Sequence, residues 1–463
     1  MAVIKVTPYA MLDSENRCDA EHIAAPILIA KNYHYGCDVI DCIQYGTSKQ
    51  LNEHGKGYSV LRLNEFEQMF IKSPEKHCSL ITEGIYQQLR LKKGDVLVCR
   101  TNGNPRLVGK TAVVMEDTEC AYASYVFKVR PNKLISPQVL TVYLNSRYGR
   151  SEIERHQMIS IQTNFSPERF KKCRIPHFSE IFQEVINKLV DQAYSNLKNS
   201  KSLYIDTEKY LLDVLGMGDF VLSTNKFSIR GLADSFYLSN RIDAQYYLQK
   251  HEEILAQIGK HKHKKLGQYV NNYSTGFAYS SKDYIEDGAY ALIRINNIVD
   301  SQLDISNAAM LSKNTALQSK KDIINIGDVL VSMSGTIGDS CCVTDDVTAV
   351  VNQRILRITP KDIDGNMLSL ILNSIIGKIQ FERIGTGGVQ TNISYFDMRK
   401  IIIPILDSNV QSQITANIQH IYVLRRQSKQ LLEAAKRAVE IAIEDSEDAV
   451  MAWLSEQHKE GVK

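Results

Sequence analysis

The sequence lacks the features that would place the chain in or across a membrane. It contains no run of about eighteen apolar residues, the length that a transmembrane helix needs. Its first residues, MAVIKVTPYAML, have neither the basic start nor the long apolar core of a signal peptide. We therefore expect a soluble protein of the cytoplasm.

The common catalytic motifs are also missing. Without a Pro-Pro dipeptide, the chain cannot carry the Asn/Asp-Pro-Pro-Tyr loop of amino-methylating DNA methyltransferases. No Asp or Glu is followed two residues later by Lys, so half of the usual restriction-type nuclease signature is absent. H-E-x-x-H and G-x-S-x-G do not occur either. These absences predict that the chain is not an enzyme and binds no catalytic cofactor.

Cysteine usage and net charge say little about partners. Nine cysteines include no C-x-x-C pair, and although His34 lies near Cys37, no second ligand pair follows at zinc-site spacing. We expect reduced thiols and no metal site. Lys and Arg number 55 against 52 Asp and Glu, a formal charge of +3 that neither requires nor excludes binding to nucleic acid.

One stretch, GNPRLVGKT at 103–111, resembles a phosphate-binding loop. Lys110 and Thr111 fit the end of G-x-x-x-x-G-K-[ST], but Asn104 stands where the first glycine must be. The following AVVM is β-branched, whereas this motif should open a helix. We interpret the stretch as a turn between strands, and a nucleotide-hydrolysing enzyme is the weakest alternative function.

The main feature is an internal repeat. QTNFS at 162–166 returns as QTNIS at 390–394, a displacement of 390 − 162 = 228. Matched blocks in one order cannot reasonably be chance, so the chain is two copies of a domain of about two hundred residues. The other pairs are LNSRYGRSEIER from Leu144 with LNSIIGKIQFER from Leu372, GDVLV at 94–98 with 327–331, LRLN at 61–64 with IRIN at 293–296, and NRCDA at 16–20 with NRIDA at 240–244.

Each copy is predicted to be mostly β-structure with one helical stretch, at 138–155 and again at 366–383. GNPRLVGKT corresponds to the SMSGTIGDS turn of the second copy with about four extra residues. The predicted strands are GYSVLRL, GDVLVCR, TAVVM and SYVFKVRP in the first copy, and YALIRI, GDVLVSM and QRILRITP in the second.

Each copy passes through Pro176 or Pro404 into a long helical pattern with an apolar stripe. Ser408 and Gln411 resemble a capping box that starts the second helix. Each helix could pack on its own domain, but their matched positions favour pairing with each other as a spacer of roughly 45 Å. The residues expected to pair the helices are Ile186, Leu189, Leu197, Ile414, Ile418, Ile421 and Leu431.

The turns are rich in residues that contact DNA, as in YGTSKQ at 45–50 and STGFAYSSK at 274–282. Asn and Gln can bond base edges, while Lys and Arg neutralise phosphates. The same residues are ordinary turn formers, so each assignment stays open. The candidates for contact with DNA are Lys49, Arg106, Lys110, Gln162, Asn164, Tyr279, Lys282, Thr336, Gln390 and Asn392.

The order of the blocks resembles a known family. GDVLVSMSGTIGDSCCVT, VVNQRILRITP and GTGGVQTNISYFDMRKIIIPIL are followed by a helix near Gln411. The first half repeats this order in GDVLVCRTNGNPRLVGK, QTNFSPERFKKCRIP and a helix from about Ser179. The chain is therefore similar, over nearly its whole length, to the specificity subunits of type I restriction-modification systems. The G-T-I-G turn is intact only in the second copy.

The resemblance implies an α+β fold in which each copy is a mostly β target-recognition domain followed by a long helix. The two helices would form an antiparallel coiled coil. The implied segments are a first recognition domain at 1–178, a helix at 179–216, a linker at 217–239, a second recognition domain at 240–406, a helix at 407–445 and a tail at 446–463.

The resemblance also implies partners. Each domain would read one half of a split, asymmetric site on double-stranded DNA, and the pairing residues named above would also help to dock two methyltransferase subunits. Those subunits would carry S-adenosylmethionine and methylate adenine, and restriction subunits using ATP and Mg²⁺ could join them. An alternative is a scaffold that sequesters methyltransferase subunits without reading DNA.

Overall fold

A computed structural model describes residues 32–158, 163–233, 235–239, 241–386 and 391–460. The chain forms two compact units. The first contains residues up to Asn199 together with Val423–Lys463, and the second is Ser200–Tyr422. Among the described residues, no helix combines the length and the apolar character needed to cross a membrane.

The first unit is built on a six-stranded sheet in the order β2-β11-β7-β9-β5-β4, beside a three-stranded sheet β10-β3-β6. Strands β2 and β7 both pair antiparallel with β11. Its strands are β1 (Tyr33–Tyr35), β2 (Ile40–Tyr45), β3 (Tyr58–Leu61), β4 (Phe66–Glu67), β5 (Phe70–Ile71), β6 (Lys76–Cys78), β7 (Val96–Cys99), β8 (Thr101–Asn102), β9 (Thr111–Val113), β10 (Cys120–Tyr122), β11 (Val126–Pro131), β12 (Thr163–Asn164) and β13 (Arg174–Pro176). Its shorter helices are α2 (Glu83–Leu89), α3 (Pro137–Asn145), α4 (Arg147–His156), α5 (Pro167–Phe170) and α14 (Glu447–Glu460).

The second unit has a four-stranded sheet in the order β15-β24-β21-β22 and another in the order β16-β20-β17-β23. Its strands are β14 (His263–Lys265), β15 (Val270–Ser274), β16 (Tyr284–Ile285), β17 (Tyr290–Ile293), β18 (Ile298–Val299), β19 (Gln302–Leu303), β20 (Ala309–Leu311), β21 (Val329–Ser332), β22 (Ser340–Cys342), β23 (Ala349–Val351), β24 (Ile355–Pro360) and β25 (Ile402–Pro404). Its shorter helices are α7 (Phe236–Ser239), α8 (Gln249–Gly259), α9 (Lys313–Ala316), α10 (Gly365–Asn373), α11 (Ile375–Ile384) and α12 (Tyr395–Met398).

The two units repeat one topology, which confirms the duplication predicted from the sequence. Strands β2-β11-β7-β9 correspond to β15-β24-β21-β22, and in both units the third and fourth strands pair antiparallel. Helices α3 and α10 begin 365 − 137 = 228 residues apart, and α4 and α11 begin 375 − 147 = 228 residues apart. The predicted α+β class is confirmed, and each predicted strand contains an observed one.

The helical stretch predicted in each copy is in fact two helices, and the LNS motif explains the break. Ser146 ends α3 and caps α4 by accepting a hydrogen bond from the amide of Gly149. Asn145 clamps the helix to β9, because its side chain bonds both the amide and the carbonyl of Thr111. Asn373 bonds the amide and carbonyl of Ser340 in the same way. The motif therefore fixes two helices to one strand.

The stretch that resembles a phosphate-binding loop is a turn, as predicted. Gly109 has a φ of +77°, and a Cβ there would lie 2.5 Å from the Ile153 side chain. Thr111 is buried in β9 and its hydroxyl donates to the Gly109 carbonyl. Gly338 occupies the matching place, with a φ of +86° and the Phe381 ring 2.3 Å from a Cβ. The glycine therefore serves the turn and its packing on the following helix.

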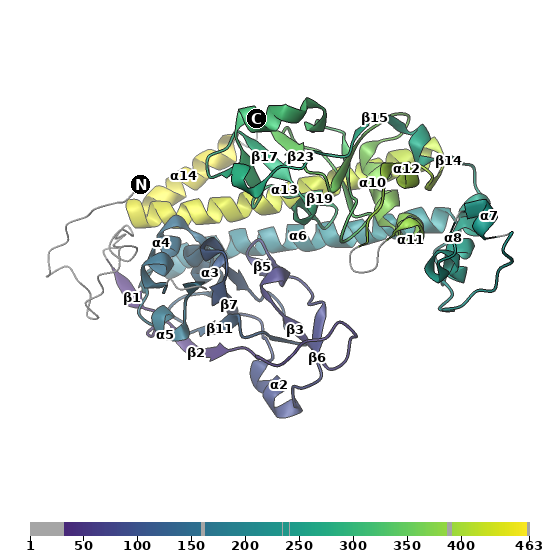
Figure 1. The fold of residues 1–463 in the computed structure, drawn as a ribbon. Coiled ribbons are helices and arrows are strands. Elements are labelled where there is room, and N and C mark those ends of the chain that lie inside the picture. Colours follow the sequence, from purple (N-terminus) through teal and green to yellow (C-terminus); the bar gives the residue numbers. More distant parts are fainter. Residues whose placement is uncertain (1–31, 159–162, 234, 240, 387–390, 461–463) are drawn as a thin grey trace. The chain divides into compact units, whose positions relative to one another are not determined.

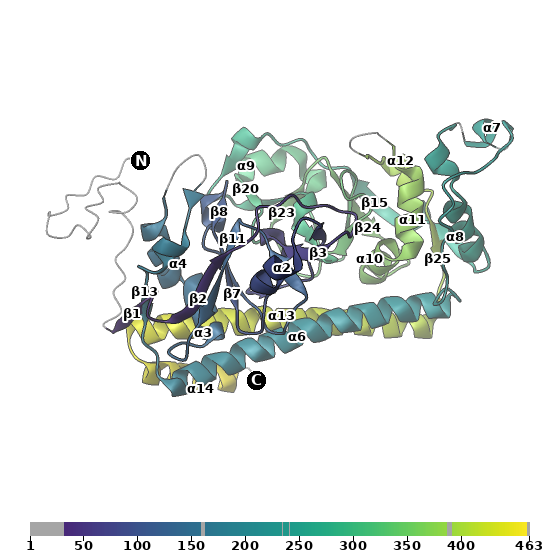
Figure 2. The same cartoon turned by 90° about the horizontal axis from the view of Figure 1, so that it is seen from below.

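The long helices α6 (Glu180–Val214) and α13 (Ser408–Glu444) pack against each other within both units. In the first unit, Ile186 and Leu197 of α6 share a core with Leu432 and Val439 of α13. Figures 1 and 2 both show the beginning of α6 beside the end of α13 in this unit. In the second, Leu211 near the end of α6 shares a core with residues near the beginning of α13. Opposite ends meet, so the pairing is antiparallel.

Two details at the helix ends differ from the predictions. Helix α13 already begins at Ser408, and the Gln411 side chain donates to the Leu406 carbonyl at 2.7 Å, so the predicted capping box is wrong. The reason is that Gln411 turns back to a carbonyl, as Gln183 does at the start of α6. The segment predicted as a tail contains α14, which buries Val450 in the first core.

Candidate nucleic-acid interface

Three loops of the first unit leave neighbouring strand ends on one side of its six-stranded sheet. The end of β2, the end of β7 and the start of β11 lie together there, because Tyr45 pairs with Phe127 and Cys99 pairs with Val126. The segments that leave these ends are 45–50, 100–110 and 122–125. We call them, together with Met158 and the described part of the QTN block at 163–165, the first loop cluster.

Backbone hydrogen bonds hold the first loop cluster together. The amide of Arg100 donates to the Tyr125 carbonyl at 2.8 Å, and its own carbonyl accepts from Phe165 at 2.7 Å. The Thr47 amide donates to Tyr122 at 2.8 Å, and its carbonyl accepts from Ser124 at 2.7 Å. Each loop is thus bonded to a neighbour by main-chain groups, which leaves side chains free to vary.

The second unit contains the same arrangement. The amide of Met333 donates to the Arg354 carbonyl, and its carbonyl accepts from Ile393. Phe277 takes the place of Thr47, because its amide donates to Val351 and its carbonyl accepts from Gln353. We call segments 274–283, 333–338 and 352–354, with Thr386 and residues 391–393, the second loop cluster.

The structure places most of the predicted DNA-contact residues in these two clusters. Asn164 pairs with Thr101, next to the turn that carries Arg106 and Lys110, and Asn392 bridges to Ser334, next to Thr336. Lys49, Arg106, Lys282, Thr336 and Asn392 are exposed, whereas Lys110 and Asn164 are partly buried. Gln162 and Gln390 lie outside the described residues.

The buried position of Tyr279 contradicts the prediction that this residue contacts DNA. Its side chain is 8% exposed and packs in a small core with Leu292 and Val350. The hydroxyl donates to the Ala316 carbonyl at 3.1 Å, and burial raises the pKa of Tyr279 to about 12. A ring held inside the domain cannot reach a base edge, so Tyr279 is a core residue.

Sequence reasoning missed the side chains at the centre of the first loop cluster. The Arg100 guanidinium donates to the Ser124 carbonyl at 3.1 Å and lies 5.1 Å from the centre of the Tyr45 ring. Tyr45 and Tyr125 are 46% and 59% exposed, although large aromatic rings are usually buried. Alignment of the two copies would have revealed Arg100, since it directly follows the GDVLVC block where the second copy has Met333.

The second loop cluster presents a different set of side chains. Phe277 is 39% exposed and Arg354 is exposed, where the first copy has Thr47 and Tyr125. At the base of this cluster, the Arg241 guanidinium donates to the carbonyls of Ile384 and Gly385, both at 3.4 Å. A hydrogen bond from Arg241 lowers the pKa of Asp243, and this charged pair within the NRIDA block holds the guanidinium that bonds the Ile384 and Gly385 carbonyls.

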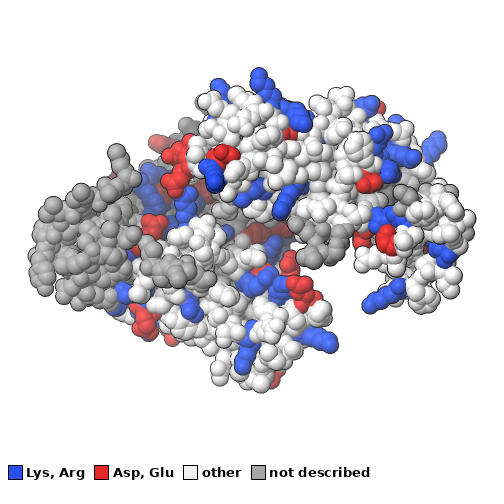
Figure 3. Space-filling view, viewed as in Figure 1, with Lys and Arg blue, Asp and Glu red and all other residues white. Residues whose placement is uncertain are grey.

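Charge is distributed unevenly between the clusters. Segments 45–50, 100–110 and 122–125 contain Lys49, Arg100, Arg106 and Lys110 and no acidic residue. The second cluster contains Lys282 and Arg354 with one acid, Asp283. On the face shown in Figure 3, basic side chains occur in small groups with acidic ones among them. Local cation content, and not the formal charge of +3, is what suits phosphate binding.

Seven residues of the long helices were predicted to pair the helices and to dock methyltransferase subunits. Five of them are buried and two are only partly buried. Ile186, Leu197, Ile414, Ile418 and Ile421 are at most 4% exposed, so they lie inside the molecule and cannot also present a docking surface. Leu189 and Leu431 are only partly buried, and their neighbours Val190 and Leu432 fill the first core instead. The docking role assigned to the buried five is therefore wrong.

The comparisons with known proteins agree with the family resemblance. Residues 259–434 match the family model described as type I restriction modification DNA specificity domain. The specificity subunit of the type I restriction enzyme EcoBI of Escherichia coli is 25% identical over 142 residues, 30% of each chain. That of StySPI from Salmonella potsdam is 18% identical over 345 residues, 73% of this chain and 70% of the other.

Two solved structures of such subunits cover most of the chain, at low identity and low TM-scores. The type I S subunit from M. genitalium is 13% identical, with a TM-score of 0.34 and 90% and 94% of the two chains covered. The HsdS subunit from Thermoanaerobacter tengcongensis is 13% identical, with a TM-score of 0.29 and 90% and 97% covered. The sequence matches confirm the resemblance to type I specificity subunits.

Proposed function

We propose that this chain, whose second half carries the DNA specificity domain of type I restriction-modification systems, reads an asymmetric bipartite DNA sequence. The observation that carries the proposal is the pair of equivalent loop clusters, which share backbone anchors but differ in exposed side chains. Equal anchors would present both clusters to DNA in the same way. Different side chains would select different bases, so the two half-sites differ.

Arg100 is the side chain that we assign to base reading in the first cluster. Its Nη1 is held by the Ser124 carbonyl and its plane lies near the Tyr45 ring, so little side-chain entropy remains to be lost on binding. Arginine recognises guanine through its O6 and N7 atoms. The first half-site should therefore contain a guanine that the second cluster, with Met333 at this place, does not read in the same way.

The paired helices α6 and α13 serve as the spacer between the two readers and as the frame for partner subunits. In this proposal two methyltransferase subunits carry S-adenosylmethionine and methylate adenine, while restriction subunits supply ATP and Mg²⁺ chemistry where they are present. Specificity subunits are non-catalytic components of such complexes. The chain itself supplies sequence recognition and geometry.

The test is to co-express the chain with its methyltransferase subunit and map methylated adenines in host DNA by single-molecule sequencing. The expected result is a split, asymmetric motif with a fixed gap. Arg100→Ala should relax one position in one half of that motif, because a good bidentate base contact contributes about 1–3 kcal/mol of discrimination. Arg100→Lys, which keeps the charge, should retain affinity but not the full preference.

Three outcomes would contradict the proposal or the role assigned to Arg100. If the assembled complex methylates DNA without any motif, the chain is a scaffold that binds methyltransferase subunits without reading DNA. If Arg100→Ala weakens both half-sites equally, the two clusters do not act as separate readers. Loss of all methylation in Arg100→Ala with an intact complex would assign Arg100 to general DNA affinity and not to base choice.

A further inference from the structure

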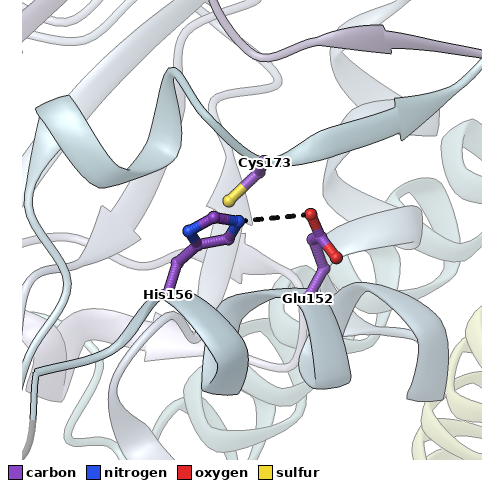
Figure 4. Close-up of side chains that lie close together, drawn as sticks. All are labelled: Glu152, His156 and Cys173. Carbon is purple, nitrogen blue, oxygen red and sulfur yellow. Dashed lines mark ion pairs between the residues drawn. The ribbon is translucent and has the colours of Figure 1, made fainter. Parts of the chain in front are cut away.

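Three side chains in the first unit form a cluster that the recognition of DNA does not use. Glu152 and His156 lie one turn apart on α4, and Cys173 directly precedes β13. Figure 4 shows the three side chains pointing toward one another. His156 Nε2 lies 3.4 Å from a Glu152 carboxylate oxygen, and one ligand atom from each residue lies within 4.8 Å of the others.

The equivalent residues of the second copy show which side chains are sufficient for the fold at these three positions. Gln380, Ile384 and Ile401 occupy the matching places, each 228 residues further along the chain: 380 − 152, 384 − 156 and 401 − 173. Gln380 accepts from the Ile402 amide at 2.8 Å and donates to the Ile402 carbonyl at 3.0 Å. One amide and two aliphatic side chains are thus sufficient to join this helix to this strand.

In the first copy the same structural task is divided between two residues. Glu152 accepts from the Arg174 amide at 2.8 Å, and Tyr143 donates to the Arg174 carbonyl at 2.6 Å. The same carboxylate oxygen of Glu152, Oε1, also lies 3.4 Å from His156 Nε2. Three positions that are contiguous in space therefore carry a carboxylate, an imidazole and a thiol in the first copy, where the second copy folds with an amide and two aliphatic side chains.

We propose that Glu152, His156 and Cys173 bind one Zn²⁺ ion. Thiolate sulfur, imidazole nitrogen and carboxylate oxygen are the ligands that zinc takes in proteins, and three of them leave a fourth position for water. With Zn²⁺, one carboxylate and one thiolate, the net charge of the site is zero, which suits residues that are 8% and 0% exposed. The thiol proton leaves to solvent when the metal binds.

The position of the ligands gives the metal a role in the first loop cluster. His156 lies immediately before segment 157–172 and Cys173 immediately after it, and this segment carries the QTN block. A metal bound to His156 and Cys173 would join the end of α4 to the residue before β13, and Met158 and residues 163–165 of the first loop cluster lie between these two ligands in the sequence. This consequence rests on the proposed function, and it predicts that only the first half-site depends on the metal.

The experiment compares the full chain with a double variant, Glu152→Gln with His156→Ile, which introduces the residues of the second copy. After removal of metal with a chelator, each protein is titrated with Co²⁺ and then with competing Zn²⁺. The unmodified chain should bind one equivalent and show a thiolate-to-cobalt charge-transfer band. The double variant should bind more than about 100-fold more weakly, since loss of even outer-shell groups costs 10–100-fold.

Cys173→Ala provides a second variant, in which the charge-transfer band should disappear. Circular dichroism checks that each protein remains folded, as the second copy leads us to expect. Absence of any bound metal in the unmodified chain, or equal binding by the double variant, would overturn the site. These measurements contain no DNA, so their failure is distinct from failure of the proposed recognition. If metal binds but its removal weakens neither or both half-sites, the assigned role in the first cluster is wrong.

Discussion

At the scale of single residues, each loop cluster contains side chains that hold a loop and side chains that face solvent. Tyr279 and Lys282 are three residues apart in STGFAYSSK and fall on opposite sides of this division. Tyr279 bonds a backbone carbonyl in the core, whereas Lys282 is exposed in a short turn. Position in a polar turn therefore does not identify a DNA contact by itself.

This division predicts different effects for two substitutions. Lys282→Ala should weaken binding at one half-site and reduce the dependence of affinity on salt by about one phosphate contact, with no change in thermal stability. Tyr279→Phe should cost about 1 kcal/mol of unfolding free energy through the lost hydrogen bond, with no change in preferred sequence. Fluorescence anisotropy with labelled duplexes at several salt concentrations, and chemical denaturation, measure the two effects.

The glycine turn gives a second prediction at this scale. Gly338→Ala should destabilise the second unit by more than about 1 kcal/mol, because a side chain at positive φ is strained and its Cβ would overlap the Phe381 ring. Gly103→Ala is the matched control, since a Cβ there would meet nothing within 4 Å. Denaturant unfolding compares them, and equal loss in both variants would contradict this account.

At the scale of elements, the spacing of apolar residues along α6 and α13 predicted the buried positions of the helix pair only to within one residue. Leu432 is 3% exposed and lies in the first core, while Leu431 is partly buried at its margin. A shift of one residue moves a side chain by about 100° around a helix. The buried seam therefore follows Val190 and Leu432, not Leu189 and Leu431.

We expect Leu432→Ala to lower the unfolding free energy by about 2–5 kcal/mol, the usual cost of emptying a packed leucine site. Leu431→Ala should cost at most about 1 kcal/mol, because much of its surface already faces solvent. Thermal unfolding of both variants tests the assignment. A larger effect at Leu431 would restore the seam predicted from the sequence.

Hydrophobic periodicity and the internal repeat predicted the strands, the duplication and the two long helices, because these features depend on local sequence patterns that occur in both copies. The break at Ser146 was not predicted, since both flanking segments are helical and only the cap separates them. Arg100 was missed because its contacts with Ser124 and Tyr45 join positions that are distant in sequence. The cluster of Glu152, His156 and Cys173 was missed because its ligands do not follow a zinc-finger spacing.

At the scale of the whole molecule, the first unit is completed by a piece of chain from the other end of the sequence. Val423–Lys463 joins the residues up to Asn199 in the first unit, whereas the second unit is the continuous segment Ser200–Tyr422. Helices α6 and α13 each have residues in both units. Shortening both helices near the boundary between the units, at 199/200 and 422/423, should therefore change the spacing of the two units without altering either loop cluster.

We predict that matched deletion of four residues, 198–201 from α6 and 423–426 from α13, shortens the gap between the half-sites. Four residues correspond to about 6 Å of helix, close to two base pairs, and to a residual rotation of about 40°. One base pair of duplex turns by about 34°, so the combined change should shorten the gap by one or two base pairs.

Methylated-adenine mapping of the deleted chain with its methyltransferase reads the new gap directly. The control deletes 198–201 from α6 alone, which puts the two helices out of register and should cost stability instead of giving a new gap. Both half-site sequences should be unchanged in the matched deletion, because the loop clusters are untouched. A folded matched deletion that keeps the original gap would show that the spacing is set elsewhere, and the helices would lose their role as the spacer.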